Sequence, residues 1–111
     1  MMNKPFSQAS ENNKHPILNI IKNVFTNTKT VLEIGSGTGQ HAVFFGQHLS
    51  HLTWQTSDLA INHQAINLWL DESDLDNLEP PVCIDLNEVW TEVKGIDFDA
   101  VYTANTLHII R

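Results

Sequence analysis

The sequence predicts an α/β fold in which a parallel sheet is flanked by helices. Short apolar segments rich in β-branched residues alternate with segments whose apolar residues recur at helical spacing, which is typical of parallel sheets with right-handed crossovers. The clearest unit is Thr30–Ala42, where a buried strand runs into a glycine-rich turn and a helix. Polar residues follow each of the four predicted strands. Ligands in such sheets bind beyond the carboxyl ends of the strands, so we expect the site there.

The first predicted element is a helix that covers one side of the sheet. Residues 1–13 form a polar N-terminal segment, and residues 14–111 form the folded domain. Ser10, Asn12 or Asn13 is the expected helix cap, and Pro16 suits the first turn. The apolar residues from Ile17 to Phe25 then fall on one helix face.

The central unit has the form of a ligand cradle. Thr30–Ile34 is the predicted strand, Gly35–Gly39 the turn and Gln40–Leu49 the helix. Glycine adopts positive φ and lets a ligand approach the backbone closely. The helix that follows points its free N–H groups and the positive end of its dipole at whatever lies there. A tight turn with no ligand is the alternative reading.

The remaining elements complete the alternation. The acidic stretch Asp71–Glu79 is expected to be a solvated loop or a frayed helix end, and Glu88–Val93 a brief helical turn. The other predicted strands and the helix are Leu52–Thr56, Ile61–Leu70, Val82–Ile84 and Phe98–Thr103.

Glycine spacing and two acids indicate the class of ligand. Dinucleotide sites favour Gly-x-Gly-x-x-Gly, whereas here the last glycine comes one residue earlier, at Gly39. Glu33, two residues before Gly35, would repel a pyrophosphate and suit a cationic amino group. Asp58 lies nineteen residues beyond Gly39, close to the ~20 expected of an acid that binds ribose hydroxyls. A helix-capping role for Asp58 is also compatible with its position.

Composition excludes several other classes. The chain has 111 residues, six Lys and Arg against thirteen Asp and Glu, and a formal charge of −7. No basic patch is available for direct nucleic acid binding or for an anionic membrane. The single cysteine, Cys83, excludes an internal disulfide and fits a reducing cytoplasm. The six histidines show no metal-ligand spacing, so we expect no metal site.

Glu33-x-Gly35-x-Gly37-x-Gly39 resembles motif I of the class I S-adenosylmethionine-dependent methyltransferases. The resemblance implies a Rossmann-like fold with S-adenosylmethionine as cofactor, and makes residues 14–111 its cofactor-binding part. In that family the methionine end of the cofactor lies over this turn, and the acid at the place of Asp85 contacts the adenine amino group. The cofactor-binding residues it implies are Glu33, Gly35, Ser36, Gly37, Gly39, Asp58, Leu59, Asp85, Leu86 and Asn105.

Four stretches together resemble a narrower group, the uncharacterised methyltransferase-like protein 26 group. They are Asn13–Leu18, Ser36–Ala42, Trp54–Asp58 and Asn105–Ile109. This resemblance implies a seven-stranded fold of which the chain would hold the N-terminal half, truncated after the fourth strand, with strand order 3-2-1-4. The fourth strand would then be a raw edge, through which a homodimer could form.

The sequence therefore favours an S-adenosylmethionine-dependent methyltransferase or its cofactor-binding half, with a small-molecule acceptor weakly preferred. A non-catalytic S-adenosylmethionine-binding module stays open, because a missing acceptor pocket would remove turnover before it removed the cradle. An NAD-dependent oxidoreductase is less favoured. Asn105 and His108 are weak candidates for contact with the methyl acceptor, His108 as a general base or simply a packed side chain.

Overall fold

The sheet has four parallel strands in the predicted order. The structure is a computed structural model that describes residues 4–84 and 97–104. The spatial order is β3-β2-β1-β4, and every neighbouring pair is parallel. This confirms the predicted α/β fold and strand order. The strands are β1 (Thr30–Glu33), β2 (Thr53–Asp58), β3 (Leu78–Cys83) and β4 (Ala100–Tyr102).

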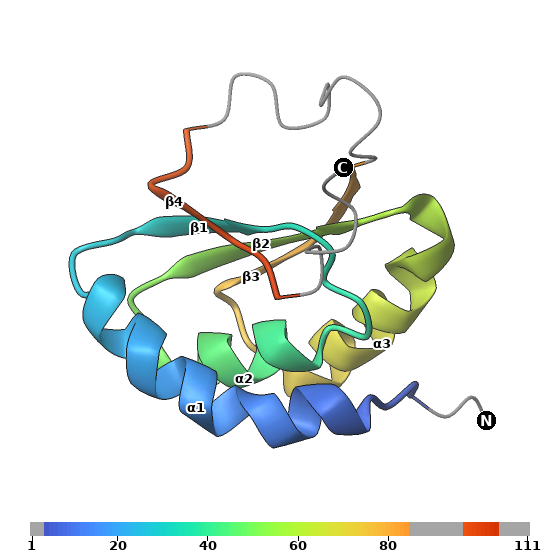
Figure 1. The fold of residues 1–111 in the computed structure, drawn as a ribbon. Helices are drawn as coiled ribbons and strands as arrows, with labels where there is room; N and C mark the ends of the chain where they lie inside the picture. Colours follow the sequence, from blue (N-terminus) through green and yellow to red (C-terminus); the bar gives the residue numbers. More distant parts are fainter. Residues whose placement is uncertain (1–3, 85–96, 105–111) are drawn as a thin grey trace, which may run out of the picture.

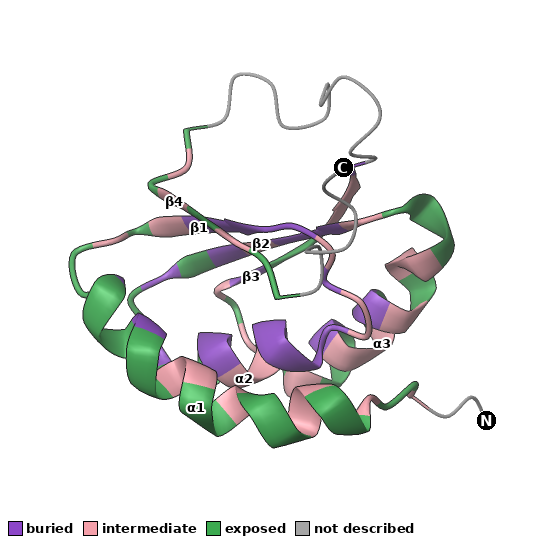
Figure 2. Ribbon diagram, in the orientation of Figure 1, coloured by how far each residue is buried: buried purple, intermediate pink, exposed green. Residues whose placement is uncertain are grey.

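Three helices cover one face of this sheet (Figure 1). They are α1 (Gln8–Val24), α2 (Gln40–His48) and α3 (His63–Ser73), the last preceded by a short 3-10 turn, Ala60–Asn62. Helix α2 is the most deeply buried, because it lies between the sheet and α1, whose outer side is exposed (Figure 2). No helix in the described ranges is both long and apolar enough to cross a membrane.

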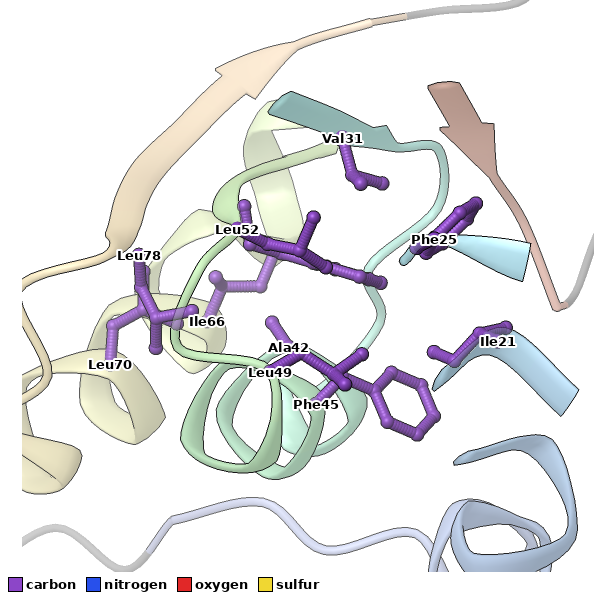
Figure 3. Packing of buried hydrophobic residues seen from close by; sticks show 11 residues of the cluster. Ile21, Phe25, Val31, Ala42, Phe45, Leu49, Leu52, Ile66, Leu70 and Leu78 are labelled. Carbon is purple, nitrogen blue, oxygen red and sulfur yellow. The ribbon is translucent and has the colours of Figure 1, made fainter. Parts of the chain in front are cut away.

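The main core lies between the sheet and the helices. Val31 and Leu52 come from the strand side, and Phe45 and Ile66 meet them from α2 and α3 (Figure 3). Trp54 is fully buried in the same cluster. A smaller cluster of Leu32, Ile34 and Ile84 forms separately. Burial of large apolar side chains contributes about 1.5–3 kcal/mol each, so this core fixes where the strand ends meet.

Helix α1 begins earlier than the sequence analysis predicts. Its cap is Ser7, whose Oγ accepts a hydrogen bond from Ser10 N at 3.2 Å. Pro16 consequently lies inside the helix and not in its first turn. The prediction of a cap at Ser10, Asn12 or Asn13 is therefore wrong. The preceding segment is held by contacts with α2 and α3 that no local pattern reveals.

Strand β3 is longer than expected and includes Pro80 and Pro81. Proline is tolerated here because β3 lies at an edge of the described sheet and a register shift interrupts its pairing with β2. Side chains of β2 take over part of the pairing. Gln55 Nε2 donates to Pro80 O at 2.7 Å, and Thr56 Oγ1 donates to Glu79 O at 2.9 Å.

Helix α3 begins at His63, two residues after its predicted start, and it ends within the acidic stretch. Ile61, the first residue of the predicted helix, lies in the 3-10 turn before it and is 86% exposed. Some predictions lie outside the described residues. They are the helical turn Glu88–Val93 and the roles of Asp85, Leu86, Asn105 and His108.

Candidate functional site

The turn between β1 and α2 depends on glycine at three positions. Gly35, Gly37 and Gly39 have φ values of 73°, 63° and 93°, which side chains disfavour. Gly39 is also packed against α3: an added Cβ would lie 3.2 Å from Trp69 Cβ and 3.3 Å from Ile66 Cα. The turn therefore leaves β1 sharply and delivers the start of α2 to the carboxyl edge of the sheet.

Two serines join the turn to β2. Ser36 N donates to Ser57 O at 2.8 Å, and Ser57 N donates to Ser36 Oγ at 3.0 Å. Ser57 Oγ donates to the backbone oxygen of Glu33. Both serines are buried, so they fix the base of the turn.

Asp58, the last residue of β2, reaches across to the same turn. Its Oδ2 accepts a hydrogen bond from Gly37 N at 2.8 Å, while its Oδ1 accepts from Leu59 N at 2.7 Å and Asn62 Nδ2 at 2.8 Å. A carboxylate has about four lone-pair sites, so three hydrogen bonds leave capacity for another donor. The strand end and the turn thus present one carboxylate at a shared edge.

Glu33 lies beneath the turn with its carboxyl group buried. Its Oε1 accepts a hydrogen bond from Trp54 Nε1 at 3.0 Å, and the residue is 2% exposed. Burial raises the pKa of the Glu33 carboxyl to about 7, and the Asp58 charge adds to the rise, whereas hydrogen bonds with Trp54 and Ser36 oppose it. Near neutral pH this side chain therefore exists in both protonation states.

His41, in the first turn of α2, is a buried imidazole. Its Nε2 lies 3.1 Å from Ser10 O, and a carbonyl oxygen only accepts, so Nε2 carries the proton. Its Nδ1 lies 3.4 Å from Tyr102 Oη. Burial lowers the pKa of His41, helped by the nearby charge of Lys14 and opposed by the hydrogen bond with Ser10. Burial likewise raises the pKa of Tyr102, and the Glu33 charge raises it further.

A cavity of about 410 Å³ opens beside the turn. The first turns or caps of all three helices contribute to its wall, so three positive dipole ends face it. Such ends attract carboxylate and phosphate groups. Its volume is within the range of small-molecule sites. The lining residues are Pro5, Ser7, Ala9, Ser10, Asn13, Gly37, Thr38, His41, Asn62, Ala65 and Ala104.

Most of the described residues predicted for the site lie together. The glycine turn and Asp58 meet at the edge of the sheet, and Leu59 follows with 45% exposure. Glu33 is adjacent but buried, and of the predicted site residues that the structure describes, Gly37 alone contributes to the cavity wall. No three His, Cys, Asp or Glu side chains form a potential metal site in the described ranges.

The sequence analysis missed several residues of the cavity wall. Ser7 and Ser10 belong to the segment predicted to precede the first helix, and Asn62 had no assigned role. His41 had no assigned role in the site, because the histidines show no metal-ligand spacing. One available signal was the stretch Gln40–Ala42, which carried the narrower resemblance and which forms the first turn of α2.

Residues 4–111 match the family described as "Protein of unknown function (DUF938)". Several solved structures that share this fold are described as methyltransferases. The S-adenosylmethionine-dependent methyltransferase SibL, in its apo form, superposes with a TM-score of 0.74 at 20% identity, covering 88% of this chain and 27% of SibL. The likeness at this identity concerns the fold.

Two further structures extend the comparison. An O-methyltransferase family protein from Burkholderia thailandensis has a TM-score of 0.67 and 22% identity over 84% of this chain and 28% of its own. An O-methyltransferase-titled structure from Nostoc punctiforme PCC 73102 has a TM-score of 0.56 and 17% identity over 80% and 26%. The chain thus spans about a quarter of the length of these proteins.

Proposed function

The chain belongs to the family described as "Protein of unknown function (DUF938)", and we propose that it is the S-adenosylmethionine-binding part of a methyltransferase. The observation that carries this proposal is the meeting of Asp58 and the glycine turn, with Gly37 N 2.8 Å from Asp58 Oδ2. Ribose hydroxyls are donors and a carboxylate accepts them. The methyltransferase titles of the structures that share this fold add support.

The residues at the edge of the sheet fit the parts of this cofactor. Asp58 would accept the ribose hydroxyls, using its remaining lone pair and one now taken by Asn62 or Gly37. The helix starts around the cavity would bind the methionine carboxylate. Glu33, expected from the sequence to suit a cationic amino group, would contribute a negative charge from beneath the turn in its ionised form. A pyrophosphate would meet Glu33 and Asp58 unfavourably.

S-Adenosylmethionine supplies an activated methyl group on a sulfonium ion. The protein must hold that methyl group in line with the acceptor and exclude water, and positioning of this kind provides much of the rate enhancement. In our proposal Asp58 fixes the adenosine end, and the glycine turn and the cavity wall fix the methionine end. A small-molecule acceptor and membership of the methyltransferase-like protein 26 group are parts of the same proposal.

Calorimetric titration with S-adenosylhomocysteine tests the ligand class. We expect micromolar binding to the protein and no comparable heat with NAD, because the last glycine of the turn comes one residue earlier than in the dinucleotide motif and Glu33 precedes the turn. Binding of NAD alone would replace the proposal with an oxidoreductase. Absence of binding by a folded sample would remove it.

A second assay separates a methyltransferase from a non-catalytic binding module. The protein is incubated with methyl-labelled S-adenosylmethionine and a small-molecule extract, and label transfer is followed by mass spectrometry. Transfer above that of a heated control supports catalysis. Tight binding without transfer to any acceptor fraction favours the binding module.

A further inference from the structure

The N-terminal end of the chain crosses beside the glycine turn from α3 to α2 (Figure 1). We name residues 4–10 the N-terminal strap. Its first part is attached to α3: Trp69 Nε1 donates to Pro5 O at 2.6 Å, and Lys4 Nζ lies 3.6 Å from the Trp69 ring centroid. Lys4 also pairs with Glu72. These contacts anchor the strap before α1 begins.

The second attachment is a single side chain, Gln40. Its Oε1 accepts from Ser7 N, and its Nε2 donates to Ser7 O at 3.3 Å. One amide therefore pairs with both backbone groups of one strap residue. Thr38 Oγ1 donates to the same Oε1 at 3.0 Å, which orients the amide. Gln40 is 5% exposed, so solvent cannot easily replace either partner.

The strap and the turn both contribute residues to the wall of one cavity. Pro5, Ser7 and Ser10 lie on the strap side, and Gly37 and Thr38 on the turn side. A ligand between them contacts both. Gln40 bridges the two sides because it belongs to the helix that follows the turn and holds the strap residue Ser7.

We propose that Gln40 is a positioning residue that latches the N-terminal strap over the cavity and so slows the escape of the bound ligand. The latch exists without ligand, whereas its effect on S-adenosylhomocysteine rests on the function proposed above. His41 strengthens the same attachment, since its Nε2–H donates to Ser10 O at 3.1 Å. The start of α2 thus serves both the turn and the segment that covers it.

The ligand-free test is hydrogen exchange in Gln40→Ala, with Gln47→Ala as the matched control. Gln47 is an exposed glutamine of the same helix. Loss of the two hydrogen bonds between Gln40 and Ser7 predicts about tenfold faster exchange of the Ser7 amide and its strap neighbours in Gln40→Ala. The control should exchange as the wild type does. Unchanged strap exchange in a folded Gln40→Ala protein would overturn the latch.

The ligand test is the dissociation rate of S-adenosylhomocysteine, measured by stopped-flow competition. We expect dissociation to accelerate about tenfold in Gln40→Ala and to stay within twofold of wild type in Gln47→Ala. Ser7→Ala is a second comparison, because it removes the helix cap and keeps both backbone groups that Gln40 holds. Equal dissociation rates in Gln40→Ala and wild type would refute the effect on the ligand.

Two further outcomes keep the proposals separate. If the wild type binds no S-adenosylhomocysteine, the proposed function fails while the exchange experiment still decides the latch. If Gln40→Ala does not fold, Gln40→Glu takes its place, because it keeps the acceptor for Ser7 N and cannot donate to Ser7 O. Its strap exchange must still exceed that of Gln47→Ala.

Discussion

Each end of the sheet carries an aspartate that accepts two backbone N–H groups. At the carboxyl end, Asp58 accepts from Gly37 N at 2.8 Å and Leu59 N at 2.7 Å. At the amino end, Asp99 accepts from Lys29 N at 2.8 Å and Thr30 N at 3.2 Å. The same arrangement, a carboxylate that accepts hydrogen bonds from two backbone amides, occurs at both ends of the sheet. An aspartate bound to backbone amides therefore does not by itself mark a ligand site.

The surroundings of the two aspartates differ. The hollow at the amino end is the larger, about 580 Å³ against 410 Å³, and His51 at its wall lies 2.9 Å from the carbonyl of Phe25, at the end of α1. A helix end carries partial negative charge. The carboxyl end instead gathers three helix starts and a positive-φ turn. Helix polarity and backbone shape, more than volume, distinguish the candidate site.

The largest difference in stability between changes at the two ends of the sheet should appear when one methyl group is added to the glycine turn. Gly39→Ala places a side chain at φ 93° and brings Cβ within 3.3 Å of the α3 backbone. Strain and crowding together should lower the free energy of unfolding by about 4 kcal/mol. Thr28→Ala at the amino end should change it by less than about 0.5 kcal/mol. Urea denaturation compares the two, and equal effects would contradict the asymmetry.

A smaller change in the free energy of unfolding should occur with pH, because the Glu33 carboxyl is buried. Its folded-state pKa is about 7 against an ordinary 4.5. Below pH 4.5 the Glu33 carboxyl is protonated in both the folded and the unfolded state, and its contribution to stability is fully present. As the pH rises to about 7, the Glu33 carboxyl ionises in the unfolded state before it does in the folded state. The free energy of unfolding therefore falls by up to about 3 kcal/mol.

Urea denaturation at pH 5 and pH 8 checks this against Glu33→Gln, which stays neutral and can still accept from Trp54. The stability of Glu33→Gln relative to wild type should rise across that interval. Glu79→Gln, which alters an exposed carboxyl of β3, is the control. A relative stability of Glu33→Gln that does not change with pH would contradict the burial argument.

Much of the fold could be predicted because local signals agreed. The apolar strand, the glycines and the helix period predicted the central unit, and the alternation of elements predicted the parallel sheet. The strand order now observed was implied by the family resemblance. The start of α1 could not be predicted, since Ser7 is held by Gln40, far along the chain. The start of β3 at Leu78 could not be predicted either, because its edge position, which tolerates Pro80 and Pro81, is not visible in the sequence.

The residues of the candidate site likewise divide into those that could be predicted from the sequence and those that could not. Asp58 and the glycines follow from spacing, and the structure brings them together. The partner of Glu33 depends on strand register: Val31 pairs with Trp54, which places Trp54 diagonally beside Glu33 on one face of the sheet. His41 and Asn62 depend on helix packing at the strand ends. Motif spacing reports neighbours along the chain, whereas these contacts come from tertiary structure.

The most direct test of the account compares the two aspartates themselves. The affinity for S-adenosylhomocysteine is measured by calorimetry in wild type, Asp58→Asn and Asp99→Asn, two variants that lose the same charge from the same kind of amide contact. We predict affinity weaker by about tenfold or more in Asp58→Asn, because charge-assisted hydrogen bonds contribute about 1.5–3 kcal/mol each. Asp99→Asn should stay within about twofold of wild type. Equal affinities in all three proteins would remove Asp58 from the site and contradict the proposed cradle.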